Sequence, residues 1–167
     1  MRTALLAFAI STIAAPSASQ PARITSAYTT IDLDKCALLD REPIPASNRW
    51  RCKGYAEIPL FVQDGDDRYD VDAGREDKDE LFSASFDYPG KTVEWRLNRG
   101  KPFAIIYRLD SANPEAPKWS RLMVETIGRG SPGCRVASID ARSRAANEQA
   151  RKAADRTLRG KAPCLKR

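Results

Sequence analysis

Hydrophobic and polar residues alternate most regularly in the centre of the chain. Residues 93–98 place Val93, Trp95 and Leu97 between charged or amide neighbours, which predicts a half-buried strand. Arg99-Gly100 predicts a turn, and residues 103–109 alternate again on the returning strand. We therefore expect a central β-hairpin.

Shorter runs of apolar, β-branched and aromatic residues predict further strands. They cover residues 24–33, 49–55, 58–63, 67–72, 119–127 and 134–140. Asp64-Gly65 predicts a hairpin turn. Loops are expected at 42–48 and 111–117, which contain prolines, and at the charged run 75–80. This series of short strands predicts a mainly antiparallel, twisted sheet.

One long helix is predicted near the C-terminus, over residues 141–158. Small residues recur there at helical spacing, namely Ala146, Ala150, Ala153, Ala154, Thr157 and Leu158. Gly160 is expected to end the helix, because glycine is the usual residue after a last helical turn. An alanine face permits close approach to a sheet. The predicted class is therefore α+β, with one C-terminal helix packed on the sheet.

Residues 1–19 have the order of parts found in a secretory signal. Arg2 is followed by an uncharged, mostly apolar stretch over 4–15, and then by Pro16 and the small residues 17–19. A membrane anchor is the alternative, but a span needs about 20 apolar residues. We therefore expect a signal peptide at 1–19, a single α+β domain at 20–167, and a periplasmic or secreted product. No later segment is expected to span a membrane.

Four cysteines, Cys36, Cys52, Cys134 and Cys164, follow this signal. An even number in an oxidising compartment predicts two disulfides. A strand leading away from Cys134 and a helix returning over a similar length bring Cys164 back beside Cys134. The expected pairs are Cys134 with Cys164 and Cys36 with Cys52. Without histidine or a C-x-x-C pair, a metal site or redox-active pair is the weaker alternative.

Charge is unevenly distributed along the chain. It has 28 Lys and Arg against 22 Asp and Glu, and no histidine, which excludes His-dependent catalysis and His-ligated metals within the chain. Residues 129–167 contain 11 basic and only 3 acidic residues. Such a basic region favours an anionic envelope component or protein partner. The alternative is the solvated outer face of a helix. No nucleic-acid-binding motif is recognised, and no cofactor is expected.

Two motifs suggest chemistry that their context does not support. Residues 128–133 spell G-x-G-x-x-G, but a strand rather than a helix is predicted next, so we expect a loop instead of a dinucleotide site. Residues 64–72 are rich in Asp, but Arg68 and Tyr69 break the EF-hand pattern. An irregular calcium site remains the alternative to a hairpin tip. No metal-binding residues are therefore assigned.

Two sets of residues remain as candidates for a functional site. Glu94 and Glu125 lie on predicted central strands and are the one carboxylate pair worth testing for glycoside hydrolysis. Trp50, Trp95 and Trp119 are candidates for sugar stacking, although core positions are the default for tryptophan. No catalytic residue is assigned, and the chain is not expected to be an enzyme.

Several stretches resemble an uncharacterised family of small exported proteins of the alphaproteobacterial periplasm. They include residues 50–55, 58–62, 93–96 and 102–107, together with 134–142 and parts of the predicted helix. The resemblance covers roughly residues 28–164 and implies export and a shared fold, but no activity. The chain departs from the family after Tyr55, where Ala56-Glu57 replaces the glycines typical of the family.

Together, these patterns favour a non-enzymatic exported protein that binds an envelope component or a protein partner. A carboxylate-dependent hydrolase of envelope polymers is one alternative. A small secreted enzyme inhibitor that acts through a loop such as 110–118 is another.

Overall fold

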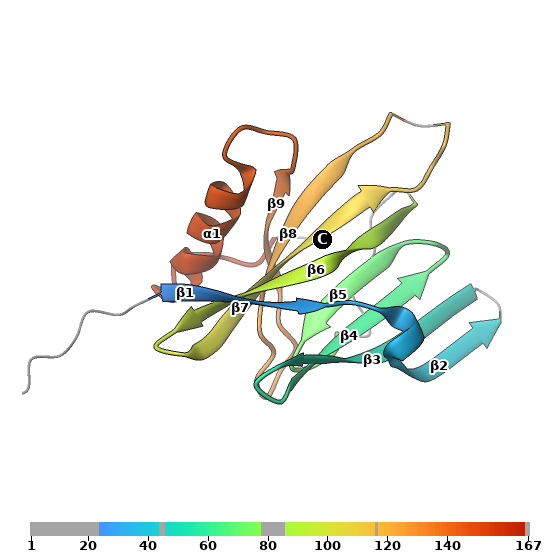
Figure 1. The fold of residues 1–167 in the computed structure, drawn as a ribbon, viewed down its shortest axis with the longest axis horizontal. Helices are drawn as coiled ribbons and strands as arrows, with labels where there is room; N and C mark the ends of the chain where they lie inside the picture. The colour runs from blue at the N-terminus through green and yellow to red at the C-terminus, as the bar shows by residue number, and fades with distance from the viewer. Residues whose placement is uncertain (1–23, 44–45, 78–85, 116, 166–167) are drawn as a thin grey trace, which may run out of the picture.

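Two antiparallel β-sheets and one α-helix make up the computed structural model, which describes residues 24–43, 46–77, 86–115 and 117–165 (Figure 1). The five-stranded sheet has the order β1 (Ile24–Thr30), β6 (Asp87–Asn98), β7 (Lys101–Ser111), β8 (Ser120–Thr126) and β9 (Arg135–Asp140). The four-stranded sheet has the order β2 (Ala37–Pro43), β3 (Ala46–Tyr55), β4 (Ile58–Gly65) and β5 (Tyr69–Ala73). A 3₁₀ helix (Leu33–Lys35) links β1 to β2, and α1 (Ala146–Thr157) follows β9. The predicted α+β class is confirmed.

The larger core involves both sheets. Alternate residues of β6 and β7, including Trp95 and Ile105, pack against the four-stranded sheet and are fully buried. The Trp95 indole N–H donates to the Thr29 hydroxyl oxygen at 2.7 Å, so the large ring is buried with its polar atom satisfied. The predicted alternation is therefore confirmed over residues 93–97 and 104–109. It is wrong at Phe103, which packs with Ala104 and Ile106 on the α1 side, next to a register shift between β6 and β7.

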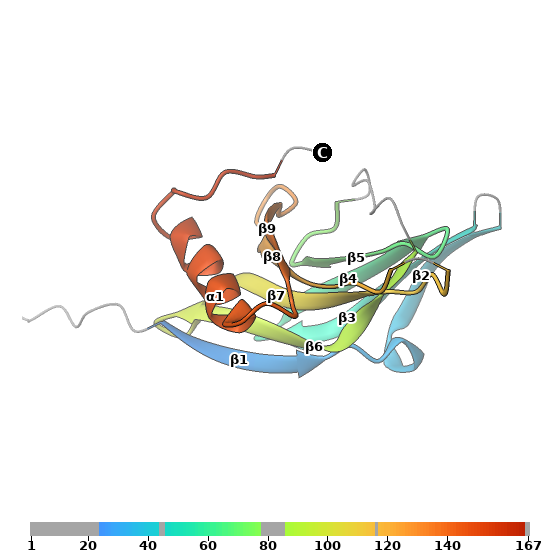
Figure 2. The same ribbon diagram turned by 90° about the horizontal axis from the view of Figure 1, so that it is seen from above.

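The smaller core lies on the other face of the five-stranded sheet, beneath α1 (Figure 2). Four alanines of α1 are buried there: Ala146, Ala150, Ala153 and Ala154. They pack on residues of β7 and β8 that include Ile106 and Val124. Because alanine brings the helix backbone close to the sheet, the predicted small-residue face is confirmed, although Leu158 at its end is exposed.

Several predicted elements differ from the structure. Strand β2 was not predicted, because it is an edge strand with a register shift and exposes Leu38 and Leu39; the predicted loop at 42–48 is therefore largely strand, with 44–45 outside the described residues. Helix α1 starts at Ala146 rather than at residue 141. Ala145, just before the helix, has a left-handed backbone conformation with φ of 63°, which a helix does not contain. Further back, the Asp140 side chain accepts the N–H of Arg142 and holds the chain in a turn.

Tight turns join the hairpins, and several place non-glycine residues at positive φ. Arg99 and Gly100 have φ of 50° and 77°, so the predicted β6–β7 turn is confirmed. The β3–β4 turn holds Ala56 and Glu57 at φ of 48° and 64°. Glycine adopts that conformation at lower cost.

Strand β5 connects the two sheets. Its neighbour on one side is β4. On its other side, Ala73 at its end and Asp67, two residues before its start, accept hydrogen bonds from the loop after β8 and from β6, respectively. The Asp87 N–H donates to the Asp67 carbonyl at 2.9 Å, and the Gly128 N–H donates to the Ala73 carbonyl at 2.8 Å. Four of the five β5 residues are buried as a result. Polar side chains of β5, such as Asp70 and Asp72, are therefore buried and need hydrogen-bonding or ionic partners.

Two disulfides brace this arrangement, in the pairing that the sequence favours. Cys36–Cys52 joins the start of the four-stranded sheet to β3, and Cys134–Cys164 joins the start of β9 to the segment after α1. The Leu165 N–H also donates to the Arg135 carbonyl at 2.8 Å. The segment after the helix is therefore tied to β9 by a covalent and a hydrogen bond. Among the described residues, no helix has the length and apolarity to cross a membrane.

Candidate functional site

A groove lies where α1 leaves part of the five-stranded sheet uncovered. Its volume is about 450 Å³, within the range typical of small-molecule sites. We call it the cationic groove and define it by Tyr28, Lys91, Glu94, Ile106, Arg108, Leu122, Asn147 and Arg151. These residues come from β1, β6, β7, β8 and α1. Three are cationic and one is acidic, so the groove carries a net positive charge.

Arg151 forms the helical wall of this groove and is held in place by Glu94. Its Nε lies 2.7 Å from Glu94 Oε1 and its Nη2 lies 3.1 Å from Glu94 Oε2, which is a two-point contact. The hydrogen bond with Glu94 raises the pKa of Arg151 above its usual value. Nη2 also donates to the Tyr28 hydroxyl at 3.2 Å. Glu94 therefore positions a permanent cation.

The floor of the groove is apolar and its remaining rim is cationic. Ile106 and Leu122 lie at the bottom, each only 5% exposed. Arg108 Nη1 donates to the Ser120 hydroxyl at 2.7 Å, which orients the guanidinium while leaving it partly exposed. Gly90 leaves room for the side chain of Arg108, since a Cβ at position 90 would lie 3.1 Å from Arg108 Cβ. Lys91 is exposed beside it.

A partly buried ion pair fixes α1 to the same face of the sheet. The Arg96 guanidinium contacts Asp155 at 2.9 Å, and Nη1 donates to the Ser26 hydroxyl at 2.6 Å. The Ser26 hydroxyl in turn donates to Glu94 Oε1 at 2.5 Å. This chain of contacts runs from the last turn of α1 to the groove, so helix position and groove geometry depend on one another.

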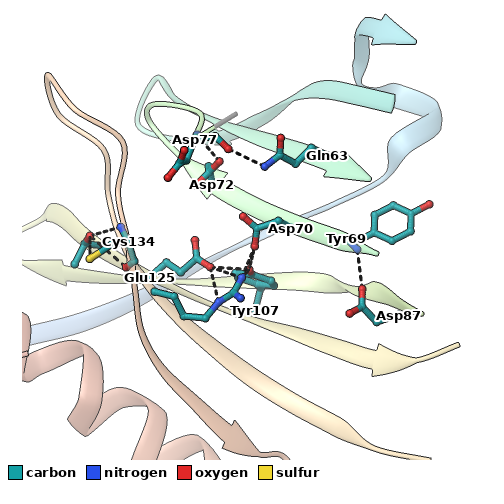
Figure 3. Close-up of polar contacts among 11 residues, drawn as sticks. Gln63, Tyr69, Asp70, Asp72, Asp77, Asp87, Tyr107, Glu125 and Cys134 are labelled. Atoms are coloured by element: carbon teal, nitrogen blue, oxygen red, sulfur yellow. Dashed lines mark hydrogen bonds and ion pairs between the residues drawn. The ribbon is translucent and has the colours of Figure 1, made fainter. Parts of the chain in front are cut away.

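A second polar cluster lies on the opposite face of the sheet, where β5 meets β7, β8 and β9 (Figure 3). We call it the buried acid network and define it by Asp70, Asp72, Tyr107, Glu125 and Arg135. The Tyr107 hydroxyl lies 2.8 Å from both Asp70 Oδ1 and Glu125 Oε1. Arg135 donates to Glu125 Oε1 at 3.0 and 3.1 Å and also contacts Asp70. All three carboxylates are at most 2% exposed.

Burial controls the ionisation of Tyr107. Its removal from water, and then the negative charges of Asp70 and Glu125, raise the pKa of Tyr107 well above its usual value, and Arg135 opposes this only in part. The phenol therefore stays protonated at physiological pH. It has one proton and can fully donate to only one of its two carboxylate neighbours.

The predicted carboxylate pair is not brought together. Glu94 is paired in register with Ile106, which faces α1, whereas Glu125 is paired with Ile105, which faces the four-stranded sheet. The two side chains therefore lie on opposite faces of the sheet. A hydrolytic mechanism that uses both around one bond is wrong for this geometry.

The other predicted candidates fall into the core or into turns. Trp95 is fully buried, and Trp50 and Trp119 pack partly buried against the same core, so they form no exposed stacking platform. Residues 128–133 form the expected loop between β8 and β9. The acidic run divides: Asp66 pairs with Arg68 at the hairpin tip, whereas its last members reach the buried acid network.

Four residues of these two sites have no sequence signal that marks them, namely Lys91, Arg108, Tyr107 and Arg135. Arg108 and Tyr107 are adjacent on β7, so alternation alone assigns them to opposite faces. Arg135 was counted with the basic C-terminal region but is mostly buried, with a side chain 16% exposed. No local pattern marks such partners, since they are brought together by strands far apart in the sequence.

Comparison of the chain with protein-family models, with curated proteins and with solved structures finds no match.

Proposed function

We propose that this protein is a non-enzymatic, exported binding protein that holds an anionic group of an envelope component in the cationic groove. The observation that carries the proposal is the convergence of Lys91, Arg108 and Arg151 from three different elements around an apolar floor. The single acid in the groove, Glu94, is engaged by Arg151 and Ser26. A ligand therefore meets positive charge at the rim.

The chemistry of the groove favours a phosphate or carboxylate attached to a larger body. Guanidinium groups match such anions with two parallel N–H donors. Ile106 and Leu122 offer apolar contact below them, and Tyr28, which is 57% exposed, offers an aromatic surface at one side. Charged sugars of envelope polymers combine these properties. Export to the periplasm or the exterior, which the sequence predicts, would bring the protein into contact with these polymers.

Several basic residues of the C-terminal region form contacts within the protein and so are not available to a ligand. Arg135 lies in the buried acid network, Arg142 pairs with Asp140, and Lys152 pairs with Glu148. These three basic residues are therefore used in contacts within the protein. Arg151 is the member of that region that lines the groove, so we assign recognition to the groove rather than to the helix surface as a whole.

The test is binding of small charged sugars, followed by amide chemical shifts in NMR spectra. Glucosamine 6-phosphate and glucuronic acid are the anionic probes, and glucose is the neutral control. We expect both anions to shift resonances of residues around Arg108 and Arg151, and glucose to shift none. Loss of one charged hydrogen bond in Arg108→Gln is expected to weaken binding about tenfold.

Arg121→Gln is the matched control. Arg121 lies on β8 beside Leu122 but alternates to the other face of the strand, where it donates to the Ser138 hydroxyl at 3.3 Å. This variant is expected to bind as the wild type does. Equal binding of glucose and the anions, or equal weakening by the two substitutions, would contradict the proposal.

No contact among the described residues favours the hydrolase or the inhibitor over this function. The carboxylate pair that the hydrolase needs is separated by the sheet, as described above.

A further inference from the structure

We propose that the buried acid network binds one hard divalent cation, of the calcium class, between the carboxylates of Asp70, Asp72 and Glu125. This site is separate from the cationic groove and does not depend on the function proposed for it. The cation would join β5 of the four-stranded sheet to β8 of the five-stranded sheet.

The three carboxylates converge from two strands (Figure 3). One oxygen from each of them lies within 4.8 Å of the other two. Calcium takes oxygen ligands at 2.3–2.6 Å, so ligands on opposite sides of one ion are about 5 Å apart. The spacing of the three oxygens is therefore compatible with a shared ion. Carboxylate oxygens are also the ligands that hard divalent cations prefer.

Asp70 supplies an independent observation. Its side chain is buried, with the residue 1% exposed, and its Oδ1 accepts from Tyr107 and Arg135. Its second oxygen, Oδ2, is buried and has no hydrogen-bond partner among the described residues. Buried carboxylate oxygens without a partner are rare, because desolvation of the charge is then uncompensated. A cation beside Oδ2 removes this cost.

The protein groups that contact Asp70 supply little positive charge. Arg135 divides one guanidinium between Asp70 and Glu125, and Tyr107 offers one proton to the same two carboxylates. Asp70 is thus partnered on one oxygen by groups that it shares. A divalent ion on the other side of the carboxylates would balance the network without displacing Arg135.

The position of the site in the fold gives the ion a consequence for stability. Strand β5 meets the five-stranded sheet through a small number of hydrogen bonds, and the proposed ligands lie on both sides of this junction. A ligand that binds only the folded state raises stability with its concentration. Calcium is therefore expected to shift unfolding of the whole protein rather than of one loop.

The experiment is calorimetric titration of the disulfide-bonded full chain with calcium chloride, after treatment with EDTA. We expect one calcium per chain, and a midpoint of thermal unfolding that rises with calcium concentration. Asp70→Asn keeps the shape of the side chain and removes its charge. It is expected to lower calcium affinity at least tenfold, with a corresponding loss of the thermal shift.

Asp66→Asn is the matched control, since Asp66 belongs to the same acidic run but lies exposed at the hairpin tip and pairs with Arg68. Its calcium affinity is expected to stay within twofold of the wild type. Equal losses in the two variants would indicate general attraction to the acidic run and overturn the site.

The wild-type measurement decides the matter even if Asp70→Asn fails to fold. Extracellular calcium modules bind in the 0.1–1 mM range at their weakest. No heat up to about 10 mM calcium, with identical unfolding in calcium and in EDTA, would overturn the proposal. It would show that the network is complete with protein groups and protons alone.

Discussion

The two faces of the five-stranded sheet carry polar clusters in different surroundings. Each contains an arginine that contacts both a carboxylate and a tyrosine hydroxyl, namely Arg151 in the cationic groove and Arg135 in the buried acid network. The groove has one carboxylate among three cationic side chains, whereas the network has three carboxylates and one arginine. In the groove, the side chain of Arg151 is 40% exposed and its partner Glu94 is 10% exposed. In the network, Arg135 is 16% exposed, and Asp70 and Glu125 are 1% exposed.

Because of this difference in exposure, we expect the cationic groove to serve ligand binding and the buried acid network to stabilise the fold. Water screens the ion pair of the groove, so its contribution to folding is small, and its cation stays accessible to a ligand. The network is largely removed from water, so each partner is needed to compensate the others. Similar residues therefore serve binding on one face and cohesion of the sheets on the other. Three measurements test this difference.

The largest expected effect is the loss of Arg135. Arg135→Met keeps much of the side-chain length but leaves Asp70 and Glu125 buried without the guanidinium. Breaking a buried pair in this way costs about 3–5 kcal/mol. Denaturant unfolding measures the difference in the free energy of unfolding. A loss below about 1 kcal/mol is typical of exposed ion pairs and would contradict the expected difference between the two clusters.

The second effect is a loss of stability in alkali. The pKa of Tyr107 is raised in the folded state, so folding retains a proton that the unfolded chain releases above pH 10. The stabilisation from this proton is complete below pH 10 and decreases above it, by up to about 1.4 kcal/mol per pH unit.

Tyr107→Phe is therefore expected to have a shallower decline in unfolding free energy above pH 10 than the wild type. The control is Tyr28→Phe, because Tyr28 is exposed at the groove. Tyr69 limits the contrast, since burial and then the charge of Asp64 raise its pKa to about 12, and it remains in both variants. Parallel slopes for wild type and Tyr107→Phe would contradict the assignment.

The smallest effect is expected in the groove. Arg151→Met removes one partner of Glu94, but Glu94 keeps its hydrogen bond from Ser26 and its ion pair with Arg96 at 3.7 Å. We expect about 1 kcal/mol or less in the free energy of unfolding, as for other partly exposed ion pairs. Binding of glucosamine 6-phosphate should weaken in the same variant. A stability loss equal to that of Arg135→Met would show that the two faces are not energetically distinct.

The sequence predicts features that depend on local pattern. The central hairpin follows from alternation and from Arg99-Gly100, and the helix follows from four alanines at helical spacing. Strand β2 escapes prediction because its exposed Leu38 and Leu39 break the alternation of a half-buried strand. Local pattern therefore predicts the central strands and the helix better than the exposed strand at the edge of a sheet.

Site residues are harder to predict, because their role depends on partners distant in the chain. Glu94 and Glu125 have similar neighbours in sequence, yet one faces α1 and the other faces β5. Their face depends on the register of β6 on β7 and of β7 on β8, which pairs Glu94 with Ile106 and Glu125 with Ile105. A one-residue change of register reverses the side-chain direction, so the shared site could not be judged from spacing.

The link between Cys134 and Cys164 has a consequence for the order of assembly. Cys134 is the neighbour of Arg135, and its partner is synthesised thirty residues later. Asp70 and Glu125 both precede Arg135, so a growing chain carries these carboxylates before the arginine that pairs with them has been synthesised. The covalent closure that holds β9 against the segment after α1 comes later still. The carboxylates of Asp70 and Glu125 can therefore be paired and buried only after β9 has been synthesised, and β9 is fixed by its disulfide only after Cys164 has been added.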